Sequence, residues 1–251
     1  MPTQQPPRIS AANCAFFLDF DGTLVHFGNP DEIVPVVDDG LRGLLLALRD
    51  AADGALAVVS GRTVAAIDGL FEPLTLASSG EHGGEWRHLV GEELQSIPVP
   101  PGLDAAHKIC EAWSKATPGT LFERKGLSLV LHFHRHPELR EAAAAVAQSV
   151  CTPDSGLRML HARGMVEIRP VSADKGVAIR RFMELPPYAG RTPVFLGDDV
   201  TDEDGFTAVN ALDGISVKIG PGTSHARYRL PNEDAVREWL ESLIEPAMRQ
   251  T

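Results

Sequence analysis

Long hydrophobic runs, paired cysteines and an excess of basic residues are all missing from this chain of 251 residues. No apolar segment approaches the roughly 20 residues of a membrane helix, and the N-terminus lacks the basic-then-apolar order of a signal peptide. Cys14, Cys110 and Cys151 are odd in number and show no metal-type spacing, so we expect reduced, buried thiols. We therefore expect a cytoplasmic protein with no membrane partner, and a Pro- and Gln-rich disordered lead-in over residues 1–10.

The charge balance is acidic, with 34 acidic against 23 basic residues and a net charge of -11. Binding to a phosphate backbone needs a basic face, so nucleic acid is not an expected partner. A small phosphorylated ligand is still compatible, because a divalent metal and one or two cations reverse the local field. The sequence leaves the oligomeric state open, with a monomer as the working expectation.

The most informative segment runs from Phe16 to Leu24, where an apolar stretch ends in two carboxylates and a glycine turn. A short apolar run of this kind predicts a buried strand. Asp19 and Asp21 follow it, separated by one residue. Two like charges at the end of a buried strand are costly unless a cation or hydrogen bonds compensate. The alternative is an ordinary strand-to-loop turn with solvated acids.

Three further segments place polar residues after apparent strands or at the start of a helix. They are Ala57–Val59 followed by Ser60, Gly61 and Arg62; the helix start Asp174-Lys175-Gly176; and Pro193–Gly197 followed by Asp198, Asp199 and Asp202. In open parallel sheets, ligands bind beyond the carboxyl ends of the strands. We therefore expect these side chains to converge with Asp19.

The order of elements predicts two domains. Strands and helices alternate over residues 1–84 and again over 170–251, which predicts a parallel sheet with helices on both faces. Within the first part, residues 38–49 place leucines at helical spacing behind Asp38 as the N-cap. Residues 85–169 read instead as helix-strand-strand, twice. The expected fold is α/β, with a Rossmann-like parallel-sheet core and an inserted smaller α+β domain whose helices share one face.

These motifs, in this order, resemble those of the haloacid dehalogenase phosphatase superfamily. The resemblance implies that Asp19 is the nucleophile and that Asp21 is a general acid/base that also ligates Mg2+ through its main-chain carbonyl. It implies that Ser60 and Lys175 are catalytic, with the phosphate cradled by Ser60 and the amide after it. Gly61 and Arg62 are then substrate contacts. The inserted domain corresponds to the superfamily's larger cap type, which lids the catalytic site.

A metal is also expected from charge. Asp19, Asp21, Asp198 and a phosphate dianion cannot converge without a cation, and hard oxygen ligands suit Mg2+. By the same resemblance Asp198 is the direct ligand, supported by Asp199 or Asp202; Asp202 is also a candidate to position Lys175. The sequence does not separate these roles. A Ca2+ loop is disfavoured because the acids lack the alternate-residue spacing of an EF-hand.

Within the superfamily, several segments resemble the trehalose-6-phosphate phosphatase family. They are Gly197–Asp204, Ser79–Glu85, Phe122–Leu129, His132–Arg135 and Val166–Pro170 followed by Lys175-Gly176. The resemblance implies hydrolysis of trehalose 6-phosphate, a small phosphorylated disaccharide, through an aspartyl-phosphate, as the last step of trehalose biosynthesis. The chain departs from the family at His134, where Tyr is usual, and at Arg163, where some members carry Lys.

Charged residues of the cap hairpins are the candidates for sugar binding, namely Glu123, Lys125, Arg163 and Glu167. Carboxylates and cations suit sugar hydroxyls because each carboxylate accepts several hydrogen bonds. The alternative is that they are solvated residues on an open sheet face. His82, in a Gly-rich hinge, is a further substrate candidate, although it could equally satisfy backbone groups.

Two alternatives to this function are open. The first is another sugar-phosphate phosphatase, for sucrose phosphate or a glycosyl-phosphoglycerate, on the same architecture. The second is a regulatory pseudophosphatase, which would have lost one of Asp19, Asp21, Lys175 or Asp198. All four are present, so the sequence favours an active hydrolase. Aspartate at position 21 agrees with this, since superfamily members that keep a long-lived phospho-enzyme carry Thr there.

Overall fold

The computed structural model describes residues 4–26, 35–162 and 164–244. Two compact units divide this chain: residues 1–95 with 174–251 form the core, and Ser96–Ala173 form the cap. The core holds β1 (Cys14–Leu18), α1 (Asp39–Ala51), β2 (Leu56–Val59), α2 (Val64–Phe71), β3 (Ala77–Gly80), β4 (Glu85–Arg87) and β5 (Gln95–Ser96); after the cap it continues with α5 (Lys175–Met183), β10 (Thr192–Gly197), α6 (Glu203–Ala211), β11 (Ile215–Ile219), β12 (Tyr228–Leu230) and α7 (Glu233–Ile244).

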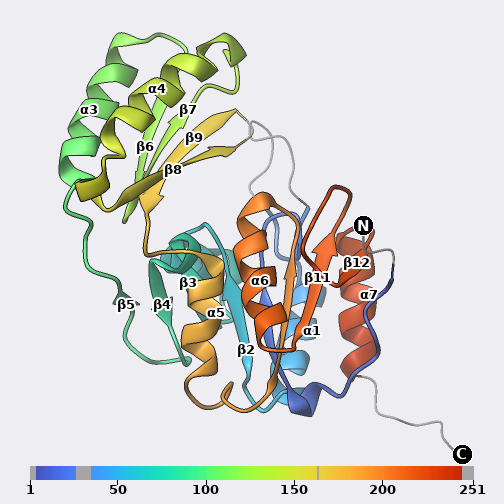
Figure 1. The fold of residues 1–251 in the computed structure, drawn as a ribbon. Helices are drawn as coiled ribbons and strands as arrows, with labels where there is room; N and C mark the ends of the chain where they lie inside the picture. The colour runs from blue at the N-terminus through green and yellow to red at the C-terminus, as the bar shows by residue number, and fades with distance from the viewer. Residues whose placement is uncertain (1–3, 27–34, 163, 245–251) are drawn as a thin grey trace, which may run out of the picture. The chain divides into compact units, whose positions relative to one another are not determined.

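The core sheet has the order β12-β11-β10-β1-β2-β3-β4-β5 among the described residues. Neighbouring strands from β12 to β3 pair in parallel, and β4 pairs antiparallel with β3. In Figure 1, α5 and α6 lie together over the face of this sheet that is turned to the viewer. The predicted parallel-sheet core is thus confirmed, with β1 and β10 adjacent at its centre.

Local sequence explains why these elements form. All residues of β1 are buried, as expected for a strand covered on both faces. Helix α1 buries Leu41, Leu44, Leu45 and Leu48, the four leucines that share one helical face. Its N-cap Asp38 accepts a hydrogen bond from the Leu41 amide at 2.7 Å.

The cap is built as helix-strand-strand, twice, as the sequence predicts. It contains α3 (Leu103–Ala116), β6 (Leu121–Lys125), β7 (Ser128–His132), α4 (Arg140–Val150), β8 (Leu157–Ala162) and β9 (Met165–Pro170). The strands form an antiparallel sheet in the order β6-β7-β9-β8. Figure 1 shows α3 and α4 side by side over one face of this sheet.

The boundaries of the two units differ from the expected range of 85–169. The cap begins at Ser96, because β4 continues the core sheet by pairing with β3, and β5 follows β4. It ends at Ala173, since the amide of Val171 still donates to Gly156 at 3.0 Å. The core thus keeps a short antiparallel extension that the sequence assigned to the cap.

The N-terminal segment also differs from expectation. Residues 4–10 belong to the described chain and are tied to the last two core elements. The carbonyl of Gln4 accepts from the Arg229 amide, that of Pro7 accepts from Trp239 Nε1, and Arg8 donates to Ser242. The predicted disorder therefore does not hold for residues 4–10, because a Pro- and Gln-rich composition does not reveal distant hydrogen-bond partners. Among the described helices, none has the length and apolarity to cross a membrane.

Candidate active site

Asp19 is the residue after β1, at the carboxyl end of a central strand. It is buried, and its amide donates to the Leu196 carbonyl of β10 at 3.0 Å. Lys175 Nζ lies 2.6 Å from its Oδ1, and the Thr23 hydroxyl donates to its Oδ2 at 3.1 Å. Burial raises the pKa of Asp19 while the Lys175 ammonium opposes the rise. Both carboxylate oxygens are therefore held from within the core.

Lys175 is the first residue of α5 and is 2% exposed. The helix begins there because Asp174 caps it, accepting from the Val177 amide at 2.7 Å. The ammonium bridges Asp19 and Asp202, at 2.6 Å from one Oδ1 of each. Burial lowers the pKa of Lys175, but the two carboxylates outweigh it and leave that pKa above the ordinary lysine value. Lys175 is thus a buried cation shared between two acids.

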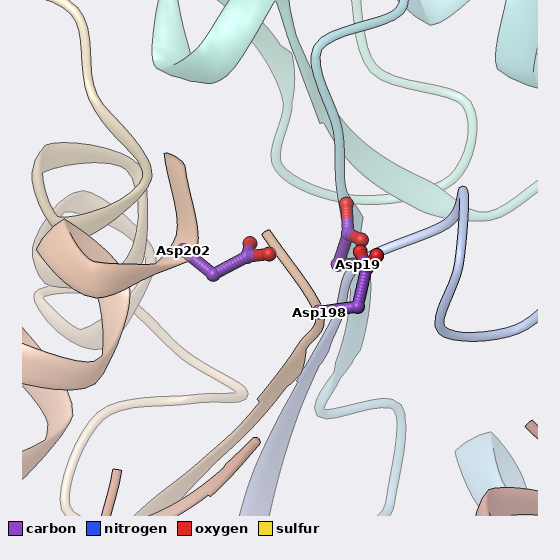
Figure 2. Close-up of side chains that lie close together, drawn as sticks. All are labelled: Asp19, Asp198 and Asp202. Carbon is purple, nitrogen blue, oxygen red and sulfur yellow. The ribbon is translucent and has the colours of Figure 1, made fainter. Parts of the chain in front are cut away.

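Asp19, Asp198 and Asp202 form one carboxylate group. An oxygen of each lies within 4.8 Å of the others, and Figure 2 shows the Asp202 carboxylate pointing toward the other two. Burial, and next the neighbouring Asp202, raise the pKa of Asp198 to about 7. Three carboxylates face one lysine ammonium here, so an added cation would relieve their repulsion.

The donor set fits a hard divalent cation. All the converging donors are carboxylate oxygens, the ligand type that Mg2+ prefers. Gly22 makes the close approach of Asp198 possible: its φ is +75°, and a Cβ there would lie 2.3 Å from Asp198 Oδ2. Asp19 and Asp198 are therefore the side chains of this group best placed to hold a metal.

Asp202 and Asp199 have other contacts. Asp202 is 0% exposed; its Oδ1 accepts from Lys175 and its Oδ2 from the Asp199 amide at 2.8 Å. The Asp199 side chain in return caps the short helix Val200–Asp202. Asp199 does not belong to the carboxylate group of the described residues. The geometry thus gives Asp202 the Lys175 contact that the sequence left open.

Asp21 also lies outside that carboxylate group. Its two oxygens accept from Arg62 Nε and Nη2, each at 2.7 Å, the bidentate geometry of a strong charged pair. The Arg62 guanidinium also lies over the Phe20 ring, 5.5 Å from its centre. Arg62, predicted as a substrate contact, is therefore placed on the predicted general acid/base.

The Ser60 loop and His82 lie against each other. Ser60 is buried at the end of β2, and its hydroxyl accepts from the Arg62 amide at 3.1 Å. A Cβ at Gly61 would lie 2.6 Å from His82 Cε1, so glycine lets the imidazole pack there. The His82 amide donates to the Ser60 carbonyl at 2.9 Å. His82 has a φ of +56°, a costly conformation that surrounding contacts must hold.

The predicted sugar-binding residues of the cap share one sheet face. Glu123 pairs with Val130 of β7, which pairs with Glu167 of β9, so both glutamates project from the same face. Lys125 is two residues along β6 and shares it. His132 Nε2 lies 2.8 Å from Glu123 Oε2, and this hydrogen bond, set against partial burial, lowers the pKa of Glu123. Arg163 lies outside the described residues.

Two contacts of the site were missed by sequence reasoning. Thr23 stands in the first motif, but nothing in the motif alone shows that its hydroxyl binds Asp19. Lys218 donates to the main-chain carbonyl of Asp198 from the neighbouring strand β11. Its signal is a single lysine within an apolar strand. Burial lowers the pKa of Lys218.

Comparison with known proteins identifies the family. The trehalose-phosphatase family model matches residues 17–234. The chain is 39% identical over 251 residues to trehalose-6-phosphate phosphatase of Escherichia coli, covering 99% of this chain and 92% of that protein. It is 35% identical over 242 residues to a probable trehalose-phosphate phosphatase of Sinorhizobium fredii, covering 92% and 88%.

Solved structures share the fold. The C-terminal domain of Candida albicans trehalose-6-phosphate phosphatase aligns with a TM-score of 0.80 at 22% identity, covering 93% of both chains. A trehalose-6-phosphate phosphatase related protein aligns with a TM-score of 0.71 at 27% identity, covering 91% of this chain and 96% of that one. The match of the family model over most of the chain, together with these relatives, shows that the chain belongs to the trehalose-phosphatase family.

Proposed function

We propose that this chain hydrolyses trehalose 6-phosphate to trehalose and phosphate through an aspartyl-phosphate at Asp19, as the last step of trehalose biosynthesis. Family membership supports the substrate, and the Escherichia coli relative carries that name. The observation that carries the chemistry is the buried Asp19 carboxylate, held by Lys175 and Thr23 beside Asp198. A cytoplasmic monomer without a nucleic-acid partner stays a prediction from the sequence.

Asp19 is the nucleophile of this proposal. Its carboxylate oxygen forms a bond to phosphorus as the bond from phosphorus to the sugar oxygen breaks. Water then attacks the aspartyl-phosphate, releasing phosphate and restoring the carboxylate. Because Lys175 and Thr23 hold its two oxygens, Asp19 is oriented before reaction, and a preset orientation lowers the barrier. Lys175 also places a positive charge next to the phosphoryl group.

Asp21 moves the protons. It protonates the departing sugar oxygen and, as a carboxylate, later takes a proton from the attacking water. A carboxylate that accepts two guanidinium hydrogen bonds from Arg62 is held ionised. We infer that the substrate phosphate competes for Arg62, which leaves Asp21 able to carry a proton. Arg62 would then be both a phosphate contact and the residue that orients Asp21.

Asp19 and Asp198 are the side chains proposed to hold Mg2+, with the Asp21 main-chain carbonyl as the family resemblance implies. When bound, Mg2+ neutralises charge on the phosphoryl oxygens. Asp202 is assigned to Lys175 instead, since both its oxygens accept hydrogen bonds. Asp199 holds the turn that carries Asp202. Ser60 and the Gly61 amide are proposed to bind a further phosphate oxygen.

The sugar is assigned to the cap face that carries Glu123, Lys125 and Glu167. Two glutamates and a lysine on one sheet face supply both acceptors and donors for sugar hydroxyls. His132 orients the Glu123 carboxylate through its 2.8 Å contact. Substrate contacts by His82 and Arg163 stay predictions.

Phosphate release from a panel of substrates tests the proposal. The panel contains trehalose 6-phosphate, sucrose phosphate, a glycosyl-phosphoglycerate and an aryl phosphate, each with Mg2+ and after exhaustive chelation. We expect the highest kcat/KM for trehalose 6-phosphate and loss of turnover on chelation. Preference for another sugar phosphate would refute the substrate, and turnover without metal would refute the metal site. Asp19→Asn serves as the control for contaminating phosphatase.

A further inference from the structure

Lys218 is a buried cation that the proposed chemistry does not use. It is 5% exposed on β11, in a strand that is otherwise mostly apolar. Lysine is almost never fully buried unless it is paired, because removing an ammonium from water is expensive. Its burial therefore needs a reason beyond the packing of the sheet.

The contacts of Lys218 lead to the backbone of the site. Its Nζ donates to the main-chain carbonyl of Asp198 and, at 2.6 Å, to that of Ile219. The pairing of β10 with β11 runs as far as Gly197 opposite Lys218. Asp198 is the next residue, so its carbonyl lies beyond that ladder and receives the ammonium instead. Lys218 thus ties the ends of two parallel strands at the point where Asp198 leaves the sheet.

We propose that Lys218 is a positioning residue of the metal site, which fixes the Asp198 backbone so that its carboxylate stays beside Asp19. This inference rests on the proposed function, since it assumes that Asp198 holds Mg2+. Asp198 has little freedom on its other side, because Gly22 approaches its carboxylate closely. A backbone shift at Asp198 would therefore misplace a ligand rather than be absorbed by rotation. Partners behind metal ligands typically contribute 10- to 100-fold in metal affinity.

Ser216 offers a matched control on the same strand. It is also buried, and its hydroxyl donates to Asn210 Oδ1 at 2.6 Å and accepts from the Arg227 amide at 2.9 Å. It is paired with Phe195, inside the ladder rather than beyond it. Ser216→Ala thus removes buried hydrogen bonds from β11 without touching Asp198.

The test is a calorimetric Mg2+ titration of the whole metal-free chain, with circular dichroism to confirm the fold. Lys218→Met removes the donor and keeps the apolar stem, and we expect its Kd for Mg2+ to rise about 10- to 100-fold. Lys218→Arg keeps a charged donor and should recover part of that loss. Ser216→Ala should lower the Tm but leave the Kd within about twofold. The Mg2+ concentration for half-maximal phosphate release should follow the Kd, while KM for the sugar phosphate at saturating Mg2+ stays unchanged.

A folded Lys218→Met chain that binds Mg2+ as tightly as the parent would overturn the inference. Equal weakening by Ser216→Ala would overturn it too, because any loss of β11 hydrogen bonds would then suffice. Should Lys218→Met not fold, Lys218→Gln carries the same test under the same criteria. Failure of the metal site itself gives a different result: the parent chain would not bind Mg2+, or Asp198→Asn would bind it equally well. In that case the proposed metal site fails, and the inference fails with it.

Discussion

Replacing Lys175 by methionine should sharply lower the free energy of unfolding at neutral pH. Lys175 is 2% exposed, and its Nζ lies 2.6 Å from an oxygen of both Asp19 and Asp202. Methionine keeps an apolar chain of similar length but leaves two buried carboxylates without their cation. Asp198, close to both, adds a third negative charge. The substitution therefore tests whether this ammonium holds the acidic cluster together.

The size of the effect follows from the contacts. Each hydrogen bond to a charged group contributes about 1.5–3 kcal/mol, and removing one partner of a buried ion pair costs about 3–5 kcal/mol. We expect a loss of about 3–5 kcal/mol, a large part of the roughly 5–15 kcal/mol of a typical domain. Adding Asp202→Asn removes one of the stranded charges. The double variant should thus lose less than the sum of the two single variants, by more than about 1 kcal/mol.

Urea unfolding at pH 7.5, followed by circular dichroism with a chelator present, measures this loss. Excess Mg2+ should restore part of the stability of Lys175→Met, because a metal bound to the folded chain stabilises it. Lys115→Met is the control: Lys115 pairs with Glu111 on α3, but its side chain is 72% exposed, so the unfolding midpoint should change little. A loss below about 1 kcal/mol for Lys175→Met would refute the reasoning.

Three further predictions concern the nucleophile, the cap and a thiol. Asp19→Asn should fold normally but release no phosphate; normal turnover by the folded variant would refute the aspartyl-phosphate. Glu123→Gln and Glu167→Gln should each lower kcat/KM for trehalose 6-phosphate roughly 10- to 150-fold, the value of a charged hydrogen bond. Aryl phosphate should be turned over as before, and an equal loss on both substrates would contradict the cap assignment. Burial raises the pKa of Cys110 to about 11, so at pH 8 only about one thiol in a thousand is ionised. Its alkylation, measured by mass spectrometry, should accelerate about tenfold per pH unit between pH 7 and 9, and a rate like that of a free thiol would exclude this environment.

The sequence by itself determined the elements and the main motif positions. Phe16–Leu18 and Val194–Leu196 are apolar runs long enough for buried strands, and both form adjacent strands of the core sheet. The leucines of α1 and its cap Asp38 obey the helical period, and all behave as predicted. These signals are readable because strand and helix periodicity, and the caps, depend on residues within a few positions of each other.

The tertiary structure alone decided how the charged groups are shared. Asp202 rather than Asp199 contacts Lys175, Arg62 binds Asp21, and Lys218 reaches Asp198 from a neighbouring strand. It also decided that the cap begins at Ser96, where an antiparallel extension of the core sheet ends. These contacts join residues far apart in the chain, and several acids of one motif are chemically equivalent on paper. Which acid meets which cation depends on strand register and side-chain direction, and these are set by the packed sheet rather than by any local pattern.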